Sequence, residues 1–96
     1  MNVKEISPQD AKRLLETDKA VFVDIRDPGS YEANHVDGAV HLTDANVEEY
    51  LSKADREKTH IVYCYHGFSS VGGAAFLMEQ GFKDVYSMVG GFAAWH

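Results

Sequence analysis

A single cysteine, Cys64, ends an apolar run and begins a short turn rich in polar residues and glycine. The run 61–63 reads as a buried strand, and a helical pattern starts at Ser70. A thiol in such a turn faces backbone N–H groups and the positive end of a helix dipole, which both favour the reactive thiolate. The same N–H groups can hold an anion. We therefore predict Cys64 as a catalytic nucleophile acting on a small anionic substrate, by sulfur or phosphorus chemistry.

The residues that follow Cys64 are predicted to form the substrate-binding loop. His66 could act as an acid or hold an anion, but a side chain at the loop mouth is the simpler interpretation. Gly67 either adopts a positive φ or lets the substrate approach the backbone. The second glycine comes too late for the Gly-x-Ser-x-Gly turn of hydrolases. The candidate loop residues are Tyr65, His66, Gly67, Phe68, Ser69 and Ser70.

Two charged residues, Asp24 and Arg26, lie at the end of a second apolar run. They could touch a substrate, but we favour structural support, in which Arg26 pairs with a carboxylate and fixes the loop after the strand. The spacing of His35, His41, His60 and His66 matches no common set of metal ligands. We therefore predict no metal site.

Composition limits the classes of protein to which the chain can belong. Its 96 residues, 45% of them apolar, are expected to form one domain over residues 1–96. The net charge of −6 argues against nucleic acid as a partner. No apolar run is long enough to span a membrane, and the N-terminus lacks the layout of a signal peptide. With one cysteine and hence no internal disulfide, a cytoplasmic location is expected.

Helical and strand patterns alternate along the chain. Ser7 and Pro8 predict the start of a helix that ends near Thr17, and Gly81 predicts the end of the helix that begins at Ser70. Thr43 is expected to cap the helix between these two. The other predicted elements are strands at 21–25, 39–42 and 84–87 and a strand ending at Cys64, a short helix at 31–34, a turn at Gly90-Gly91 and a closing helix from Phe92.

This alternation is typical of an α/β fold with a mostly parallel sheet. Ligands of such sheets bind at the carboxyl ends of the strands, beside helix N-termini. Cys64 lies at that position, so the fold and the local pattern point to the same site.

Three motifs in order resemble the rhodanese family. Asp24-Ile25-Arg26, Tyr31, His35-Val36 and Gly38-Ala39 are similar to its upstream signature, and the run from Gly90 to Trp95 is similar to its downstream signature. Cys64 stands between them, where rhodaneses carry their catalytic cysteine. The loop resembles that of single-domain thiosulfate sulfurtransferases of the GlpE type, except that Phe68 stands where a small polar residue is expected.

The resemblance implies a five-stranded, mostly parallel central sheet with helices on both faces. It also implies that Cys64 takes sulfur from thiosulfate as a persulfide and passes it to cyanide or to a thiol, such as that of thioredoxin. The loop N–H groups from Tyr65 to Ser70 would hold the persulfide, and no cofactor would be required.

Two other functions remain open from the residues. The first is a persulfide carrier with little thiosulfate turnover. The second is a phosphatase or arsenate reductase, which share this fold and cysteine geometry. Against the second, cysteine-dependent phosphatases usually place an arginine six residues after the nucleophile to clamp phosphate, and here that residue is Ser70. The loop is also one residue shorter than in the phosphatase relatives.

Overall fold

A computed structural model describes residues 2–95. Its central feature is a five-stranded sheet with the strand order β1-β5-β4-β2-β3. Every neighbouring pair of strands is parallel, as in the register of Val23 with Val62 and of Val62 with Ser87. The strands are β1 (Lys4–Ile6), β2 (Ala20–Asp24), β3 (Val40–His41), β4 (Thr59–Tyr63) and β5 (Val85–Met88). The predicted α/β class with a parallel five-stranded sheet is confirmed.

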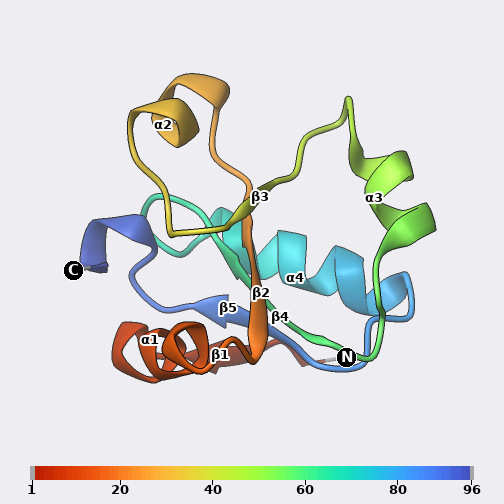
Figure 1. The fold of residues 1–96 in the computed structure, drawn as a ribbon, viewed down its shortest axis with the longest axis horizontal. Helices are drawn as coiled ribbons and strands as arrows, with labels where there is room; N and C mark the ends of the chain where they lie inside the picture. The colour runs from red at the N-terminus through yellow and green to blue at the C-terminus, as the bar shows by residue number, and fades with distance from the viewer. Residues whose placement is uncertain (1, 96) are drawn as a thin grey trace.

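Helices cover both faces of the sheet, as predicted. The helical elements are α1 (Pro8–Glu16), α2 (Pro28–Ala33), α3 (Val47–Lys53), α4 (Ser69–Glu79) and the 3₁₀ turn η1 (Phe92–Ala94). Figure 1 shows α1 and the C-terminal segment on one side of β2, with α3 and α4 on the other. One apolar cluster joins Phe22 and Ile61 to Ala11 of α1, and a second joins Val23 and Val62 to Leu77 of α4. The described residues contain no helix that is long and apolar enough to cross a membrane.

The predicted start of α1 and end of α4 are confirmed, and α4 begins at Ser69, one residue before its predicted start. The Ser7 side chain accepts a hydrogen bond from the N–H of Asp10 and so caps α1. At the end of α4, Gly81 has φ +92°, and the N–H groups of Gly81 and Phe82 donate to the carbonyls of Met78 and Leu77. This pair of bonds is a Schellman motif, which satisfies carbonyls that the helix end would leave free.

Four local predictions were incomplete or wrong. Strand β1 was not predicted, because three residues with one buried side chain carry too little pattern to recognise. Helix α2 begins at Pro28, before the predicted start at residue 31, because Asp27 caps it and proline fits the first turn. Thr43 does not cap α3, which begins after Asn46. The closing helix is the short 3₁₀ turn η1, and Trp95 follows it.

The segment after β5 returns to the carboxyl end of β4. The N–H of Phe92 donates to the Cys64 carbonyl at 2.8 Å, and the N–H of Ala93 donates to the Tyr65 carbonyl at 2.9 Å. Gly91 has φ +60° and ψ −158°, a conformation that is essentially restricted to glycine. A Cβ added there would lie 2.6 Å from the Cys64 oxygen and 2.5 Å from the Tyr65 oxygen. The close approach of the two segments therefore requires glycine at this position.

We predict that Gly91→Ala and Gly72→Ala change stability in opposite directions. Gly91→Ala should lower the free energy of unfolding by about 2–4 kcal/mol, through backbone strain and the clash with two carbonyl oxygens. Gly72 lies inside α4 with open space around its would-be Cβ, so alanine there should raise stability by about 0.5–1 kcal/mol. Urea unfolding of both variants measures the difference. Equal effects of the two substitutions would contradict the close approach at Gly91.

Candidate active site

Cys64 follows β4 at the carboxyl edge of the sheet, and its side chain is 8% exposed. The loop that begins there runs directly into α4 at Ser69. No side chain caps α4, so the N–H groups of its first turn are available to other acceptors. The sulfur is therefore enclosed by a loop and a helix start that present backbone donors.

Two backbone N–H groups donate to the Cys64 sulfur. The Gly67 nitrogen lies 3.1 Å from Sγ, and the Ser70 nitrogen lies 3.3 Å from it. The Ser70 hydroxyl oxygen lies 3.5 Å from Sγ, so it can accept from the thiol or donate to the thiolate. Backbone donors and a hydroxyl are arranged around one sulfur, as a stabilised anion requires.

These contacts lower the pKa of the Cys64 thiol. Burial on its own raises the pKa, because it removes water from the charged form. The hydrogen bonds from the Ser70 hydroxyl and from the N–H groups of Ser70, Gly67 and His66 together outweigh burial. The net effect brings the thiol below its ordinary pKa and increases the fraction of thiolate near neutral pH.

The hydrogen bond from Ala93 fixes the direction of one of these donors. A trans peptide unit is planar, and its C=O and N–H point in opposite directions. Because the Tyr65 carbonyl accepts from Ala93, the N–H of His66 in the same peptide unit points away from Ala93. That N–H is one of the groups that lower the Cys64 pKa. The C-terminal segment thus orients the N–H of His66, which belongs to the loop.

The side chains of the loop mostly face solvent. Tyr65 and Phe68 are 52% and 84% exposed, and their neighbours His66 and Ser69 are also exposed. The rings of Tyr65 and His66 meet edge to face, with centroids 4.8 Å apart. Gly67 has φ +95°, which confirms the positive φ that was one of the two alternatives predicted for this glycine. The structure therefore brings Gly67 and Ser70 to the sulfur, and leaves Tyr65, Phe68 and Ser69 at the rim.

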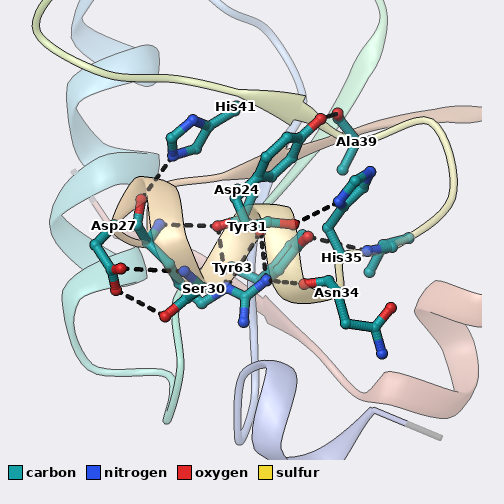
Figure 2. Close-up of polar contacts among 11 residues, drawn as sticks. Asp24, Asp27, Ser30, Tyr31, Asn34, His35, Ala39, His41 and Tyr63 are labelled. Carbon is teal, nitrogen blue, oxygen red and sulfur yellow. Dashed lines mark hydrogen bonds and ion pairs between the residues drawn. The ribbon is translucent and has the colours of Figure 1, made fainter.

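Asp24 and Arg26 form a buried ion pair beside this edge of the sheet. Arg26 Nη2 and Nε lie 2.8 and 3.2 Å from Asp24 Oδ2, and Nη2 also donates to the Asn34 carbonyl at 2.6 Å. The side chains are 5% and 0% exposed. Figure 2 shows Asp24 with Asn34 and Tyr63 close to it. Nε and Nη2 of the guanidinium therefore donate within the fold, to Asp24 and to the Asn34 carbonyl.

The chain from α2 to β3 is tied down by further polar contacts, drawn in Figure 2. The hydroxyl of Tyr31 donates to the Ala39 carbonyl at 2.8 Å, and a ring nitrogen of His41 lies 2.7 Å from the Arg26 carbonyl. The Tyr31 ring is stacked between the rings of His35 and His41, at centroid distances of 3.9 and 4.5 Å. These contacts explain the residue types of the upstream motif as scaffolding.

Phe92 connects this scaffold to the cysteine loop. The Arg26 guanidinium lies 4.2 Å from the centroid of the Phe92 ring, and the Tyr63 ring stacks on Phe92 at 5.9 Å. The Phe92 backbone donates to Cys64. The ion pair therefore supports the backbone of the active loop through one aromatic ring.

The histidines do not gather. Two of them stack on Tyr31, whereas His60 is buried on β4, where its ring lies 2.7 Å from the Tyr50 hydroxyl. Within residues 2–95, no three His, Cys, Asp or Glu side chains come close enough to hold a metal ion together.

A cavity of about 510 Å³ lies between α3 and α4, and it is lined by Ile25, Leu42 and Phe76 among others but not by Cys64.

Sequence reasoning missed two features of the site. The role of Gly91 was not predicted, because the close approach joins segments that are about 27 positions apart in the chain. Ser87 was not predicted either, although its hydroxyl lies 2.7 Å from that of Ser70. A serine at an inward-facing position of a buried strand was the only available signal.

Comparison with known proteins agrees with this geometry. The family model for the rhodanese-like domain matches residues 7–96. The chain is 50% identical over 95 residues to thiosulfate sulfurtransferase GlpE of Coxiella burnetii, covering 99% of this chain and 89% of that protein. It is 46% identical to the protein of the same name from Pseudoalteromonas translucida, with 99% and 90% covered. The human single-domain sulfurtransferase TSTD1 has the same fold, with a TM-score of 0.85 at 18% identity over 97% of this chain and 95% of that one. The resemblance expected from the three motifs is confirmed, and the chain belongs to the rhodanese-like domain family.

Proposed function

We propose that this protein is a thiosulfate sulfurtransferase whose nucleophile is the Cys64 thiolate. The observation that carries the proposal is the set of donors around one sulfur, together with the lowered pKa of its thiol. The curated relatives with 46–50% identity, which carry the name thiosulfate sulfurtransferase, support the choice of substrate. The chain covers 89–90% of their length, so the similarity extends over nearly the whole of these relatives.

The first half of the reaction charges the enzyme. The Cys64 thiolate attacks the outer sulfur of thiosulfate and forms a new S–S bond. The bond between the two thiosulfate sulfurs breaks, and its electron pair leaves with sulfite. The negative charge of the thiolate now resides on the outer sulfur of the Cys64 persulfide. In this proposal the N–H groups of the loop from Tyr65 to Ser70 hold that anion, and the donation of Gly67 and Ser70 to Sγ supports it.

In the second half of the reaction, the outer sulfur of the persulfide is transferred to an acceptor. A nucleophile, either cyanide or the thiolate of an acceptor such as a small thiol or thioredoxin, attacks the outer sulfur. The persulfide bond breaks, and its electron pair returns to Cys64 as a thiolate. No redox cofactor or metal takes part in this cycle. We place the reaction in the cytoplasm, where thiols remain reduced.

The loop composition argues against phosphate chemistry. The residue six positions after Cys64 is Ser70, which is fully buried and bonded to Ser87. A phosphatase of this kind would need an arginine there to clamp two phosphate oxygens. A persulfide carrier fed by another protein uses the same cysteine, so it differs from the proposed enzyme in turnover and not in geometry.

We predict that Cys64→Ser abolishes sulfur transfer without unfolding the protein. A serine hydroxyl is a far poorer nucleophile at neutral pH, and it is close in size to the thiol. Intact-protein mass spectrometry after incubation with thiosulfate should show a gain of one sulfur in the wild type and none in the variant. Cyanide should remove that sulfur and release thiocyanate. Transfer by the variant would rule out Cys64 as nucleophile, and a wild type that gains no sulfur from thiosulfate would leave only the carrier.

We predict that Cys64 reacts as a thiolate at a lower pH than a free thiol. Because the hydrogen bonds lower its pKa, the thiolate is present above that depressed value and is lost as the pH falls through it. The rate of alkylation by iodoacetamide, followed from pH 5 to 10, should have a midpoint below about 8.5. The chain has one cysteine, so the rate reports Cys64 alone. A midpoint at or above that of a model thiol would contradict the stabilised thiolate.

We predict that the enzyme binds thiosulfate weakly, with a high KM, and that one added positive charge in the loop lowers this KM. The loop has no Lys or Arg and the net charge is −6, so KM should lie near or above about 1 mM. Phe68 is 84% exposed at the rim, so Phe68→Arg should lower KM several-fold at low salt. This gain should fade in about 1 M salt, where charges are screened within about 3 Å.

Phe68→Gln is the matched control, because it removes the ring without adding charge. It should leave the salt dependence of KM as in the wild type. Saturation of the wild type at low-micromolar thiosulfate, or an equal effect of the two substitutions, would contradict the electrostatic explanation.

A further inference from the structure

Two buried hydroxyls lie in line behind the Cys64 sulfur. Ser70 Oγ is 3.5 Å from Sγ, and Ser87 Oγ is 2.7 Å from Ser70 Oγ. The residues are 0% and 1% exposed, so water does not reach either hydroxyl. Ser87 lies on β5, where it is in register with Val62 of β4. A strand that carries no residue of the proposed loop therefore places a polar group two hydrogen bonds away from the nucleophile, through Ser70.

The Ser87 hydroxyl has no second partner among residues 2–95. This limits how the protons of the two serines can be arranged. If the thiol donates to Ser70, the two serines share one hydrogen bond, and the proton of whichever serine accepts it lies in a buried site without an acceptor. If the sulfur is a thiolate, Ser87 donates to Ser70 and Ser70 donates to the sulfur. In that second arrangement both protons are used, and the chain of bonds ends on the negative charge.

We propose that Ser87 is a positioning residue that holds the Ser70 hydroxyl in the orientation that donates to the Cys64 thiolate. The proposal rests on the proposed function, because the thiolate is the attacking species. Ser87 does not touch the sulfur or the substrate. Its contribution is directional, since a hydroxyl that accepts one hydrogen bond from Ser87 has its own proton left to donate. Hydrogen bonds in such a chain also polarise one another.

Few charges compete with this effect at the sulfur. The loop contributes only His66 and Tyr65, which face solvent, and the first turn of α4 carries no acidic residue. On β2 and the chain after it, Asp24 and Arg26 are paired with each other. On β1, Glu5 is in register with Ser87 but is exposed at the sheet edge. The groups that set the ionisation of the thiol are therefore mainly hydrogen-bond donors, among which the Ser70 hydroxyl can reverse its direction.

The test is the pH profile of Cys64 alkylation in a double-mutant cycle of Ser70→Ala and Ser87→Ala. Ser87→Ala should raise the midpoint by roughly 0.5–1 pH unit, and Ser70→Ala by at least as much. The double variant should match Ser70→Ala alone, because Ser87 acts only through Ser70. At a pH above all midpoints, the limiting alkylation rates should differ by no more than about threefold, because the nucleophilicity of a thiolate rises only weakly with its pKa. An unchanged midpoint in Ser87→Ala, or shifts that add in the double variant, would overturn the proposal.

A second pair of variants separates the hydroxyl from packing. Threonine and valine have nearly the same shape, so Ser87→Thr and Ser87→Val fill the buried position alike and differ in the hydroxyl. The midpoint in Ser87→Thr should stay near that of the wild type, and that in Ser87→Val should rise as in Ser87→Ala. Equal midpoints in the two variants would overturn the proposal, even if both are less stable than the wild type.

The readout is independent of sulfur transfer. Alkylation needs no thiosulfate, so the Ser87 shift can be measured whatever the protein transfers. A wild type that gains no sulfur from thiosulfate would count against the proposed function alone. A wild type that gains sulfur while the Ser87 variants keep its alkylation midpoint would count against Ser87 alone.

Discussion

The site depends on two backbone hydrogen bonds, from Phe92 to the Cys64 carbonyl and from Ala93 to the Tyr65 carbonyl. A peptide unit that is held by its oxygen has its N–H directed the opposite way, because the unit is planar and trans. Anchoring these carbonyls outward therefore allows the loop to turn N–H groups toward the sulfur. Without this anchor, the loop from Cys64 to Ser69, with Gly67 inside it, would have many backbone conformations, and only some of them would present donors to one atom.

The parallel sheet makes that anchor available. The carboxyl ends of β2, β4 and β5 lie at one edge, so the segments that follow these strands meet although they are far apart in sequence. Each contributes a different part of the support. The end of β2 and the chain after it supply the Asp24–Arg26 pair, and the chain after β5 supplies Phe92, against whose ring the guanidinium lies. A buried ion pair is weak evidence of stability, but a bidentate pair fixes direction well, and direction is what this site requires.

Sequence reasoning reached the parts of the site that are local in the chain. The strand, turn and helix around Cys64 are contiguous, and their pattern predicts both the α/β class and the position of the thiol. Ser87 and Gly91 were beyond reach, because their roles exist only when β5 and the loop are brought together. Strand β1 was missed for a different reason, since three residues at a sheet edge are ordered by pairing with β5 and not by their own pattern. The closing helix that was expected from Phe92 is only the 3₁₀ turn η1, which ends at Ala94.

The electrostatics of the site are local. A chain with net charge −6 and no cation in its loop has no long-range field to attract anions, so thiolate and persulfide are stabilised only by donors that touch them. Such donors act on a charge at one position and fall off quickly with distance, whereas a guanidinium clamps a broad anion by two of its oxygens. Because the loop has backbone donors and no guanidinium, it is a poor site for phosphate. The same donors suit a persulfide, whose charge lies on one sulfur. It follows that long-range attraction of the substrate contributes little to the choice of chemistry in this loop. The choice depends mainly on which atom the backbone N–H groups can surround, and here that atom is a sulfur.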